Sequence, residues 1–176
     1  MTEEGTAPRP ALDEDTLAFA RRVFHHARGG EAGELGELLR MGLPPNIRNE
    51  KGDSLLMLAA YHGHLDAVRV LLDHGGDPEL ANDRGQTPLA AAAFKGDAAV
   101  LRLLLERGAA VDGSGPDGRT ALMTAAMFDR SEIVALLLGH GADPHARDAG
   151  GRTALDVAEA MGAADTPRLL AAAART

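Results

Sequence analysis

The sequence predicts an all-α fold, a solenoid built from stacked pairs of antiparallel helices. Three series of residues lead to this prediction, and each recurs every 33 residues. One series is Gly52, Gly85, Gly118 and Gly151, and a second is Gly42, Gly75, Gly108 and Gly141. The third consists of leucine pairs that begin at Leu38 and Leu39 and recur up to Leu137 and Leu138. A fixed period of this length is typical of helical repeats that stack and share one continuous core.

Residues 82–114 show what one period encodes. Gly85 lies at the tip of a tight turn, where a positive φ is needed, and Thr87 then caps a short inner helix. Asp97 caps a second, outer helix whose apolar residues follow the i, i+3, i+4 spacing of a buried face. Gly108 terminates that outer helix. Each period therefore predicts a turn followed by two antiparallel helices.

The segments GQTPLAAAAFKGD and VLRLLLERGA resemble the ankyrin repeat, as do GDSLLMLAAYHGH and GRTALMTAAMFDRSEIVALLLGHGADP. The resemblance covers roughly Ala18 to Ala174. It implies short β-hairpin-like finger turns that line a concave surface together with the inner helices, while the outer helices form the back. The position that is usually His after the Thr-Pro-Leu triplet differs here: it is Met57, Ala90, Met123 and Asp156. The hydrogen bonds that this His makes in the family are therefore not assumed.

We expect about five repeats, including a cap at each end that shields the apolar stacking face. The predicted segments are a disordered polar tail at 1–12 and a single ankyrin-repeat domain at 13–176. Within the domain we expect an N-terminal capping repeat at 13–48, full repeats at 49–81, 82–114 and 115–147, and a C-terminal capping repeat at 148–176. Asp129 replaces the glycine between the helices of the third full repeat, and Asp can adopt the left-handed conformation at modest cost.

Composition narrows the function classes. The formal net charge is −8 and the basic residues are scattered, which disfavours binding to nucleic acid. The chain has no cysteine, its N-terminal residues are acidic, and no apolar run approaches the roughly 18 residues of a membrane span. We therefore expect a cytoplasmic protein that does not enter a membrane.

The motifs that could carry chemistry are explained by the repeat. Residues 113–118 match the dinucleotide-binding pattern G-x-G-x-x-G but lack the strand and helix that it requires. The tightest histidine clusters, His62 with His64 and His25 with His26, supply no set of four metal ligands. The hydroxyl side chains in each repeat are explained as helix caps: Ser54, Thr87, Thr120 and Thr153. We predict no catalytic residue, no metal site and no cofactor.

The candidate binding site lies where each inner helix ends, on the predicted concave surface. The two residues before each glycine turn are Tyr61 and His62, Phe94 and Lys95, and Met127 and Phe128. Tyr61, Phe94 and Met127 are expected to form an apolar ladder with a spacing of roughly 10 Å. The finger tips surround it with a mixed-charge rim: Glu50, Lys51, Asp53, Asp83, Arg84, Gln86, Asp117, Arg119 and Arg152. Such a surface is typical of a contact site, although the ladder could instead only pack against neighbouring repeats.

The sequence thus predicts a non-catalytic interaction module, an adaptor or inhibitor that binds a protein partner through the concave face. The monomer is favoured over a homo-oligomer. An alternative is a structural module that self-associates through the same apolar strip. A third alternative, an enzyme or a regulator that binds a small molecule or metal, would need a deep pocket with convergent polar groups, which the repeat plan does not supply.

Overall fold

The computed structural model describes residues 13–175, so the predicted disordered tail at 1–12 lies outside the described residues. The described residues form ten helices: α1 (Glu14–Gly29), α2 (Ala32–Arg40), α3 (Leu55–His62), α4 (Leu65–Asp73), α5 (Pro88–Lys95), α6 (Ala98–Glu106), α7 (Ala121–Met127), α8 (Ser131–Gly139), α9 (Ala154–Ala160) and α10 (Thr166–Ala173). Over this part of the chain there is no strand, only an isolated antiparallel bridge between Arg48 and Ser54. The prediction of an all-α solenoid is confirmed.

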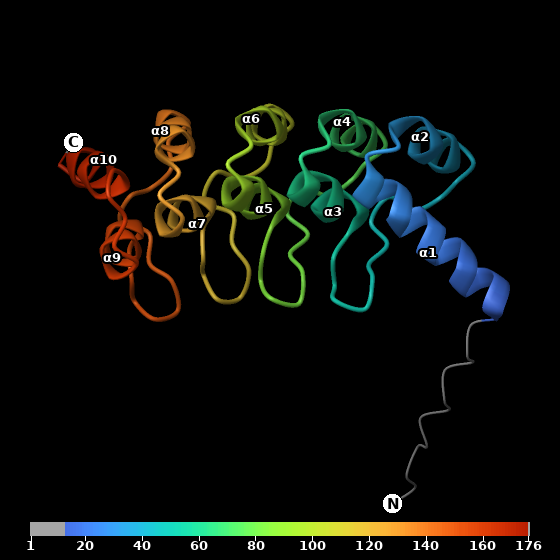
Figure 1. Cartoon of the computed structure of the whole chain (residues 1–176), viewed down its shortest axis with the longest axis horizontal. Helices are drawn as coiled ribbons and strands as arrows, with labels where there is room; N and C mark the ends of the chain where they lie inside the picture. Colours follow the sequence, from blue (N-terminus) through green and yellow to red (C-terminus); the bar gives the residue numbers. More distant parts are fainter. Residues whose placement is uncertain (1–12, 176) are drawn as a thin grey trace, which may run out of the picture.

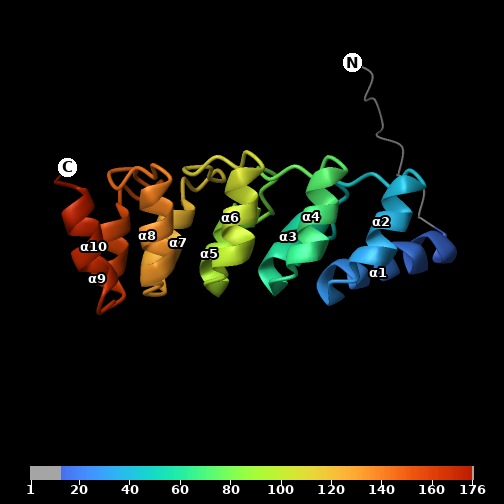
Figure 2. The same ribbon diagram turned by 90° about the horizontal axis from the view of Figure 1, so that it is seen from above.

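The helices form two parallel rows (Figure 1). The inner row runs through α1, α3, α5, α7 and α9, each of which contacts the next. The outer row runs through α2, α4, α6, α8 and α10, and the connections from an outer helix to the next inner helix hang below the inner row as fingers. Seen from above, the pairs lie side by side along one axis (Figure 2). The array therefore places equivalent residues of successive repeats next to one another.

The 33-residue apolar series forms the core. Leu71, Leu104 and Leu137 of the outer helices are fully buried. The inner row contributes fully buried alanines at the same period: Ala59, Ala92, Ala125 and Ala158. Small side chains let the inner helices approach closely, and the leucines fill the space between the two rows. One continuous core results, shared by all the repeats.

Each inner helix from α3 to α9 begins after the Ser or Thr residue that was predicted to cap it. The side-chain hydroxyl of each capping residue accepts the backbone N–H three positions later, at 3.1–3.2 Å: Met57 to Ser54, Ala90 to Thr87, Met123 to Thr120 and Asp156 to Thr153. Asp156, one of the departures from the family pattern, also accepts the backbone N–H of Thr153 at 2.8 Å. This reciprocal pair is a capping box, so the departure at this position stabilises the start of α9.

A second series of polar contacts, which was not predicted, joins neighbouring repeats. The side-chain acceptors are Asn46, Glu79 and Asp112, and the donors are the backbone N–H groups of Asp77, Ala110 and Asp143, at 2.8, 2.8 and 3.1 Å. The acceptors recur every 33 residues but belong to three residue types. The hydrogen bond needs only a side-chain oxygen that can reach the next repeat, and Asn, Glu and Asp all supply one. The residue types at these positions therefore do not reveal the series.

Neighbouring fingers are also joined by main-chain hydrogen bonds, except at the middle junction. The backbone N–H of Asp83 donates to Lys51 O at 3.2 Å, and that of Ala149 donates to Asp117 O at 2.8 Å. The equivalent donor position between the second and third fingers is Pro116, which has no N–H. The main-chain series is therefore interrupted at this junction.

Close backbone contact takes the place of that hydrogen bond. A Cβ atom at Gly115 would overlap the carbonyl oxygen and the Cα of Gly85 in the preceding finger. The two fingers thus approach so closely that Gly115 has room for hydrogen only.

We predict that Gly115→Ala lowers the free energy of unfolding by about 1–3 kcal/mol, because one finger backbone must move to admit the methyl group. Urea denaturation measures this change. The matched control is Gly33→Ala, since a Cβ at this position of α2 meets nothing within 4 Å. The control should be neutral or stabilise by up to about 0.5 kcal/mol. Equal effects of the two substitutions would contradict the close packing of the fingers.

Asp129 adopts the left-handed conformation predicted for it, with a φ of 50°. Its carboxylate also has a role that the sequence analysis did not foresee. It accepts backbone N–H bonds from Ala164 at 3.0 Å, from Asp165 at 3.1 Å and from Thr166 at 2.9 Å. These groups open α10, which has no side-chain cap of its own. Asp129 therefore caps the last helix from the preceding repeat.

These hydrogen bonds, that of Thr166 first, hold the pKa of the Asp129 carboxyl below its usual value of 3.8. A carboxyl with a depressed pKa stabilises the fold above its unfolded pKa, and the contribution is lost as the pH falls through the folded pKa. We expect Asp129→Asn to lower the melting temperature at neutral pH, with a difference from wild type that narrows below pH 3.8. Thermal melts followed by circular dichroism measure this, with the exposed Glu159→Gln as control. A difference independent of pH would contradict the charged cap.

Candidate functional site

Three aromatic rings form a row along the ends of the inner helices, which we call the ring row: Tyr61, Phe94 and Phe128. The Tyr61 and Phe94 rings are stacked, with centroids 5.7 Å apart and an interplanar angle of 11°. The Phe94 and Phe128 rings meet edge to face, with centroids 4.6 Å apart. Tyr61 is 39% exposed and Phe128 41% exposed, while Phe94 is half-buried between them. The row is thus a continuous apolar strip that is still partly open.

The ring row corrects the predicted ladder in two respects. Its third member is Phe128, whereas the ladder assigned that place to Met127, which is half-buried. α7 ends at Met127 and Phe128 is its C-cap, one residue before Asp129 takes the place of the usual glycine. The spacing is also closer than the expected 10 Å, because side chains of adjacent helices lean together.

Two cationic or titratable side chains accompany the ring row. The Nζ of Lys95 lies 5.1 Å from the centroid of the Tyr61 ring, a cation–π distance. His62 meets the same ring edge to face at 5.2 Å and stacks on His64 at 6.1 Å. Burial lowers the pKa of His62 below 6.5, and the charges of His64, Lys95 and Arg28 lower it further. The electrostatic surroundings of His62 are therefore positive.

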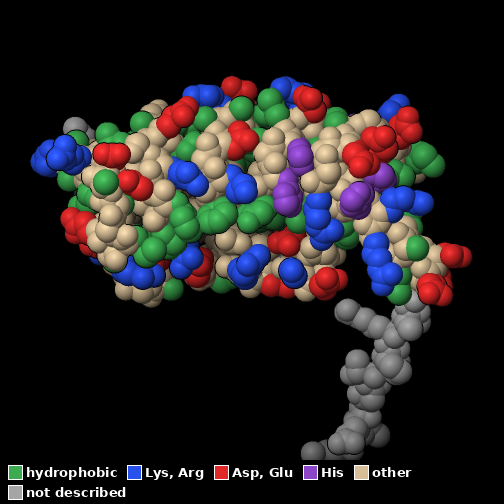
Figure 3. Space-filling model, viewed as in Figure 1, with side chains coloured by type: hydrophobic (Ala, Val, Ile, Leu, Met, Phe, Trp, Pro, Cys, Tyr) green, Lys and Arg blue, Asp and Glu red, His purple; other side chains and the backbone are tan. Residues whose placement is uncertain are grey.

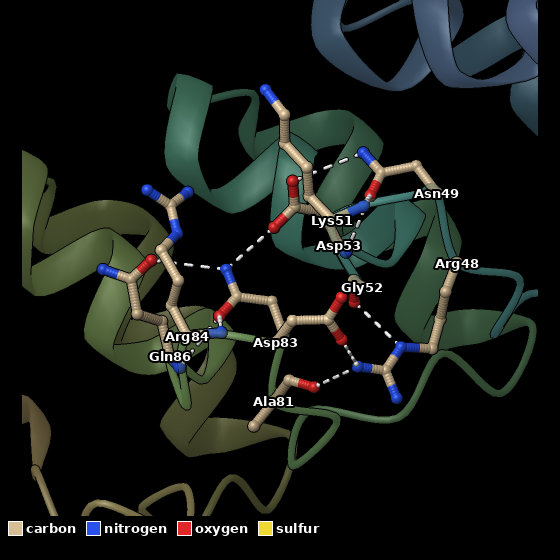
Figure 4. A network of polar contacts seen from close by, with 10 residues as sticks. Arg48, Asn49, Lys51, Gly52, Asp53, Ala81, Asp83, Arg84 and Gln86 are labelled. Carbon is tan, nitrogen blue, oxygen red and sulfur yellow. Dashed lines mark hydrogen bonds and ion pairs between the residues drawn. The ribbon is translucent and has the colours of Figure 1, made fainter.

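Asp53 was predicted to belong to the exposed rim, and the structure contradicts this. Its side chain is buried, with 7% exposure. Its two carboxylate oxygens accept the amide of Asn82 at 2.8 Å and the amide of Asn49 at 3.3 Å (Figure 4). Asp53 lies between two fingers and satisfies their polar groups, so its function is to hold the fingers together.

The other rim residues divide into bonded and free side chains. The bonded ones are Asp83 with Arg48, Gln86 with Asn82, Asp117 with Arg119, and Arg152 with Asp148. Glu50, Lys51 and Arg84 are exposed, and their side chains have no polar partner within residues 13–175. Figure 4 shows Lys51 and Arg84 extending away from the network. These three side chains are available to a ligand.

Two hollows that share lining residues form what we call the groove; the first borders the ring row at Tyr61, and no residue of the row lines the second. The first is lined by Tyr61 and His62 at the end of α3, by Lys51 and Arg84 of the first two fingers, and by Arg28 of α1. Seven of the fifteen residues predicted for the site line this hollow: Glu50, Lys51, Asp53, Tyr61, His62, Arg84 and Gln86. The structure thus gathers the N-terminal half of the predicted site around one depression.

The second hollow lies between α1 and the first finger and extends the groove toward the N-terminal end. It shares Arg28, Asn49 and Glu50 with the first hollow. The α1 residues that line it are Leu17, Ala20, Arg21, Phe24 and Arg28. This part of the groove was not predicted, although Leu17, Arg21, Phe24 and Arg28 follow the i, i+4, i+7, i+11 spacing of one helix face.

The far end of the predicted site is separate from the groove. Asp117, Arg119 and Arg152 belong to the third and fourth fingers and line neither hollow. Figure 3 shows hydrophobic side chains along the middle of the face, with basic side chains above and below them. The predicted residues therefore form a strip rather than a single pocket.

Two histidines outside the groove, His74 and His140, make local hydrogen bonds. Their Nδ1 atoms lie 2.8 Å from the carbonyl oxygens of Val70 and Leu136, four residues earlier. His64 contacts the carbonyl oxygen of Arg28 at 2.7 Å. In the described part of the chain, no three His, Asp or Glu side chains are arranged to hold a metal ion. None of the helices described here has the length and apolar character needed to cross a membrane.

We predict that Lys95→Gln raises the pKa of His62, because it removes one of the positive charges that oppose protonation of the imidazole. A pH titration of the histidine ring protons by NMR measures the shift, with His62→Gln used to assign the signal. Arg102→Gln on the outer helix α6 removes the same charge far from the groove and should leave the His62 pKa unchanged. A fall in that pKa in the Lys95 variant would contradict the assigned cause.

Comparisons with known proteins agree with this architecture. A family model described as ankyrin repeats in three copies matches residues 24–114, which is just over half of the chain. A second model, for ankyrin repeats in many copies, matches residues 104–158. The chain is similar to an ankyrin repeat protein of Pseudomonas aeruginosa strain PAO1, with 58% identity over 64 residues. That stretch spans 36% of this chain and 37% of the relative. With its stacked helix pairs, capped inner helices and finger turns, this chain belongs to the ankyrin-repeat family.

Proposed function

We propose that this chain is a non-catalytic adaptor or inhibitor that acts in the cytoplasm as a monomer and binds a segment of a protein partner along the ring row and the groove. Ankyrin repeats are generally protein-interaction modules. The proposal adds the place of binding and the mode of recognition, in which a rigid surface receives the partner.

The observation that carries the proposal is the partial exposure of the ring row. Two of its three rings are about two-fifths exposed, although a core packed with alanine and leucine is close beside them. Aromatic residues supply large contact areas and are enriched at the energetic centres of interfaces. A partner that covers the row would complete its burial and gain free energy without reorganising the scaffold.

The remaining polar groups support a binding role over catalysis. Ser54, Thr87, Thr120 and Thr153 cap helices, so their hydroxyl oxygens already accept backbone N–H bonds. Asp53 accepts bonds from two amides between the fingers. A nucleophile must instead be positioned against a base. The hydroxyls and this carboxylate therefore stabilise the fold.

We predict that Phe94→Ala weakens partner binding by about 2 kcal/mol, or about 30-fold, because Phe94 is the central ring of the row. The partner is first isolated by crosslinking in cells that express the chain, and its affinity is then measured by titration calorimetry. Leu169→Ala is the matched control, since Leu169 is also exposed and apolar but lies on α10. The control should leave the affinity unchanged, and both variants should retain helical content.

A large loss of thermal stability in Phe94→Ala with unchanged affinity would show that the ring row only packs the repeats. Self-association through the same strip is a separate outcome. Light scattering at two protein concentrations would then show a mass that grows with concentration in wild type and stays monomeric in Phe94→Ala.

A further inference from the structure

We propose that the groove selects an acidic segment of the partner, a stretch of Asp and Glu residues next to an aromatic or aliphatic side chain. This inference rests on the proposed function, because it assigns the chemistry of the partner at the same surface.

The charge of the groove is opposite to that of the chain as a whole. The chain has 26 acidic and 18 basic residues. Among the charged residues that line the two hollows, basic side chains nevertheless predominate: Arg21, Arg28, Arg48, Lys51 and Arg84. Their acidic lining residues are Glu50 and Asp53. Lys95 adds a further cation beside Tyr61.

The acidic residues gather elsewhere, in particular on the outer helices. The exposed acids of α2, α4, α6 and α8 are Glu34, Glu37, Asp66, Asp73, Glu106 and Glu132. The basic residues of these four helices are Arg40, Arg69 and Arg102. The outer helices thus carry more acids than bases, although Asp73 is paired with Arg107 and Glu132 with Arg102, whereas bases predominate among the charges that line the groove. An acidic segment is therefore attracted to the groove more strongly than to the outer helices.

Most cations of the groove are also free to pair with a ligand, whereas Arg48 is already bonded to Asp83 and to the carbonyl oxygens of Gly52 and Ala81. The guanidinium groups of Arg21, Arg28 and Arg84 have no hydrogen-bond partner within the described residues. The Asp53 carboxylate, in contrast, is already satisfied by two amides. Arg pairs with carboxylates in bidentate geometry, so the groove offers unused donors suited to Asp and Glu.

The charges around His62 also favour a negatively charged ligand. Burial lowers the pKa of His62 below 6.5, and the charges that lower it further, from His64, Lys95 and Arg28, are all positive. Lys51, Arg84, Glu50 and Asp53 line the same hollow. A carboxylate that enters the hollow would favour the protonated imidazole, so the His62 pKa reports on the charge of the ligand.

Apolar surfaces at both ends of the groove specify the rest of the segment. Leu17, which is 38% exposed, lines the second hollow, and the ring row borders the first at Tyr61. A purely polyanionic ligand would leave these surfaces exposed. Nucleic acid, with a charge on every phosphate, would also be repelled by the net charge of −8. An acidic protein segment with apolar anchors matches both features.

The test uses a library of random twelve-residue peptides displayed on phage and panned against the full 176-residue chain. We expect the enriched peptides to carry net negative charge and at least one aromatic or aliphatic residue. Synthetic copies should bind more weakly as salt is raised from about 50 to about 300 mM. Each should also raise the His62 pKa, whereas a twin with Asn and Gln in place of the acids should not.

Charge reversals identify the residues. Arg28→Glu and Arg84→Glu should each weaken the acidic peptides by about tenfold, since a like charge replaces an attractive one. Arg69→Glu on the outer face of α4 makes the same change of charge away from the groove and should alter the affinity by less than about twofold. Circular dichroism establishes that all three variants fold.

The two proposals fail in different ways. If the enriched peptides are neutral or basic but bind the Phe94→Ala variant more weakly, the acidic-segment proposal is overturned. The proposal that a partner binds the ring row then stands. Tighter binding of a twelve-nucleotide single strand than of the acidic peptides also overturns the acidic-segment proposal. Both proposals are overturned if acidic peptides bind the Phe94→Ala, Arg28→Glu and Arg84→Glu variants as tightly as the wild type. They are also overturned if panning against the wild type enriches no peptides beyond those enriched against Phe94→Ala.

Discussion

The structure depends on the burial of apolar faces between consecutive helix pairs in a fixed register. Leu71, Leu104 and Leu137 are fully buried because each outer helix packs against its own inner helix and against the neighbouring pairs. One helix pair alone would expose apolar surface on both sides, so stability is a property of neighbouring repeats together. The same register brings Tyr61 and Phe94, one period apart, into ring contact.

The groove shows how a repetitive scaffold yields a surface that is not repetitive. The finger network between Asn82 and Asp53 uses positions that are set by the fold. The neighbouring tips, Lys51 and Arg84, take no part in that network through their side chains, so the network does not require these residue types. A rigid framework holds these two residues in place before a ligand arrives, which lowers the entropy lost on binding. Specificity and stability thus reside in different side chains of the same loop.

The sequence predicted those features that repeat with the period and depend on residue type, such as the caps from Ser54 to Thr153 and the turn glycines. Features that depend on how closely two segments approach, or on where a helix ends, were not predicted correctly. Asp53 sits at a finger tip like its exposed neighbours, and only the approach of Asn82 shows that it is buried. Phe128 rather than Met127 joins the ring row because α7 ends at Met127, just before Asp129 takes the place of the usual glycine. α1 lacks the motif of the full repeats, so its arginines could not be assigned to the groove from the period.

The carboxylate of Asp129 has a consequence for how such arrays are inherited. It belongs to the third full repeat by sequence, yet it caps α10, which lies in the following helix pair. The unit formed by α9 and α10 therefore depends on the unit before it. A duplication or deletion of units before it, or a transplant to another array, would preserve a properly started α10 only where the preceding unit supplies an acid at that turn. A junction that keeps the start of α10 capped therefore lies before Asp129 rather than at the finger that precedes α9.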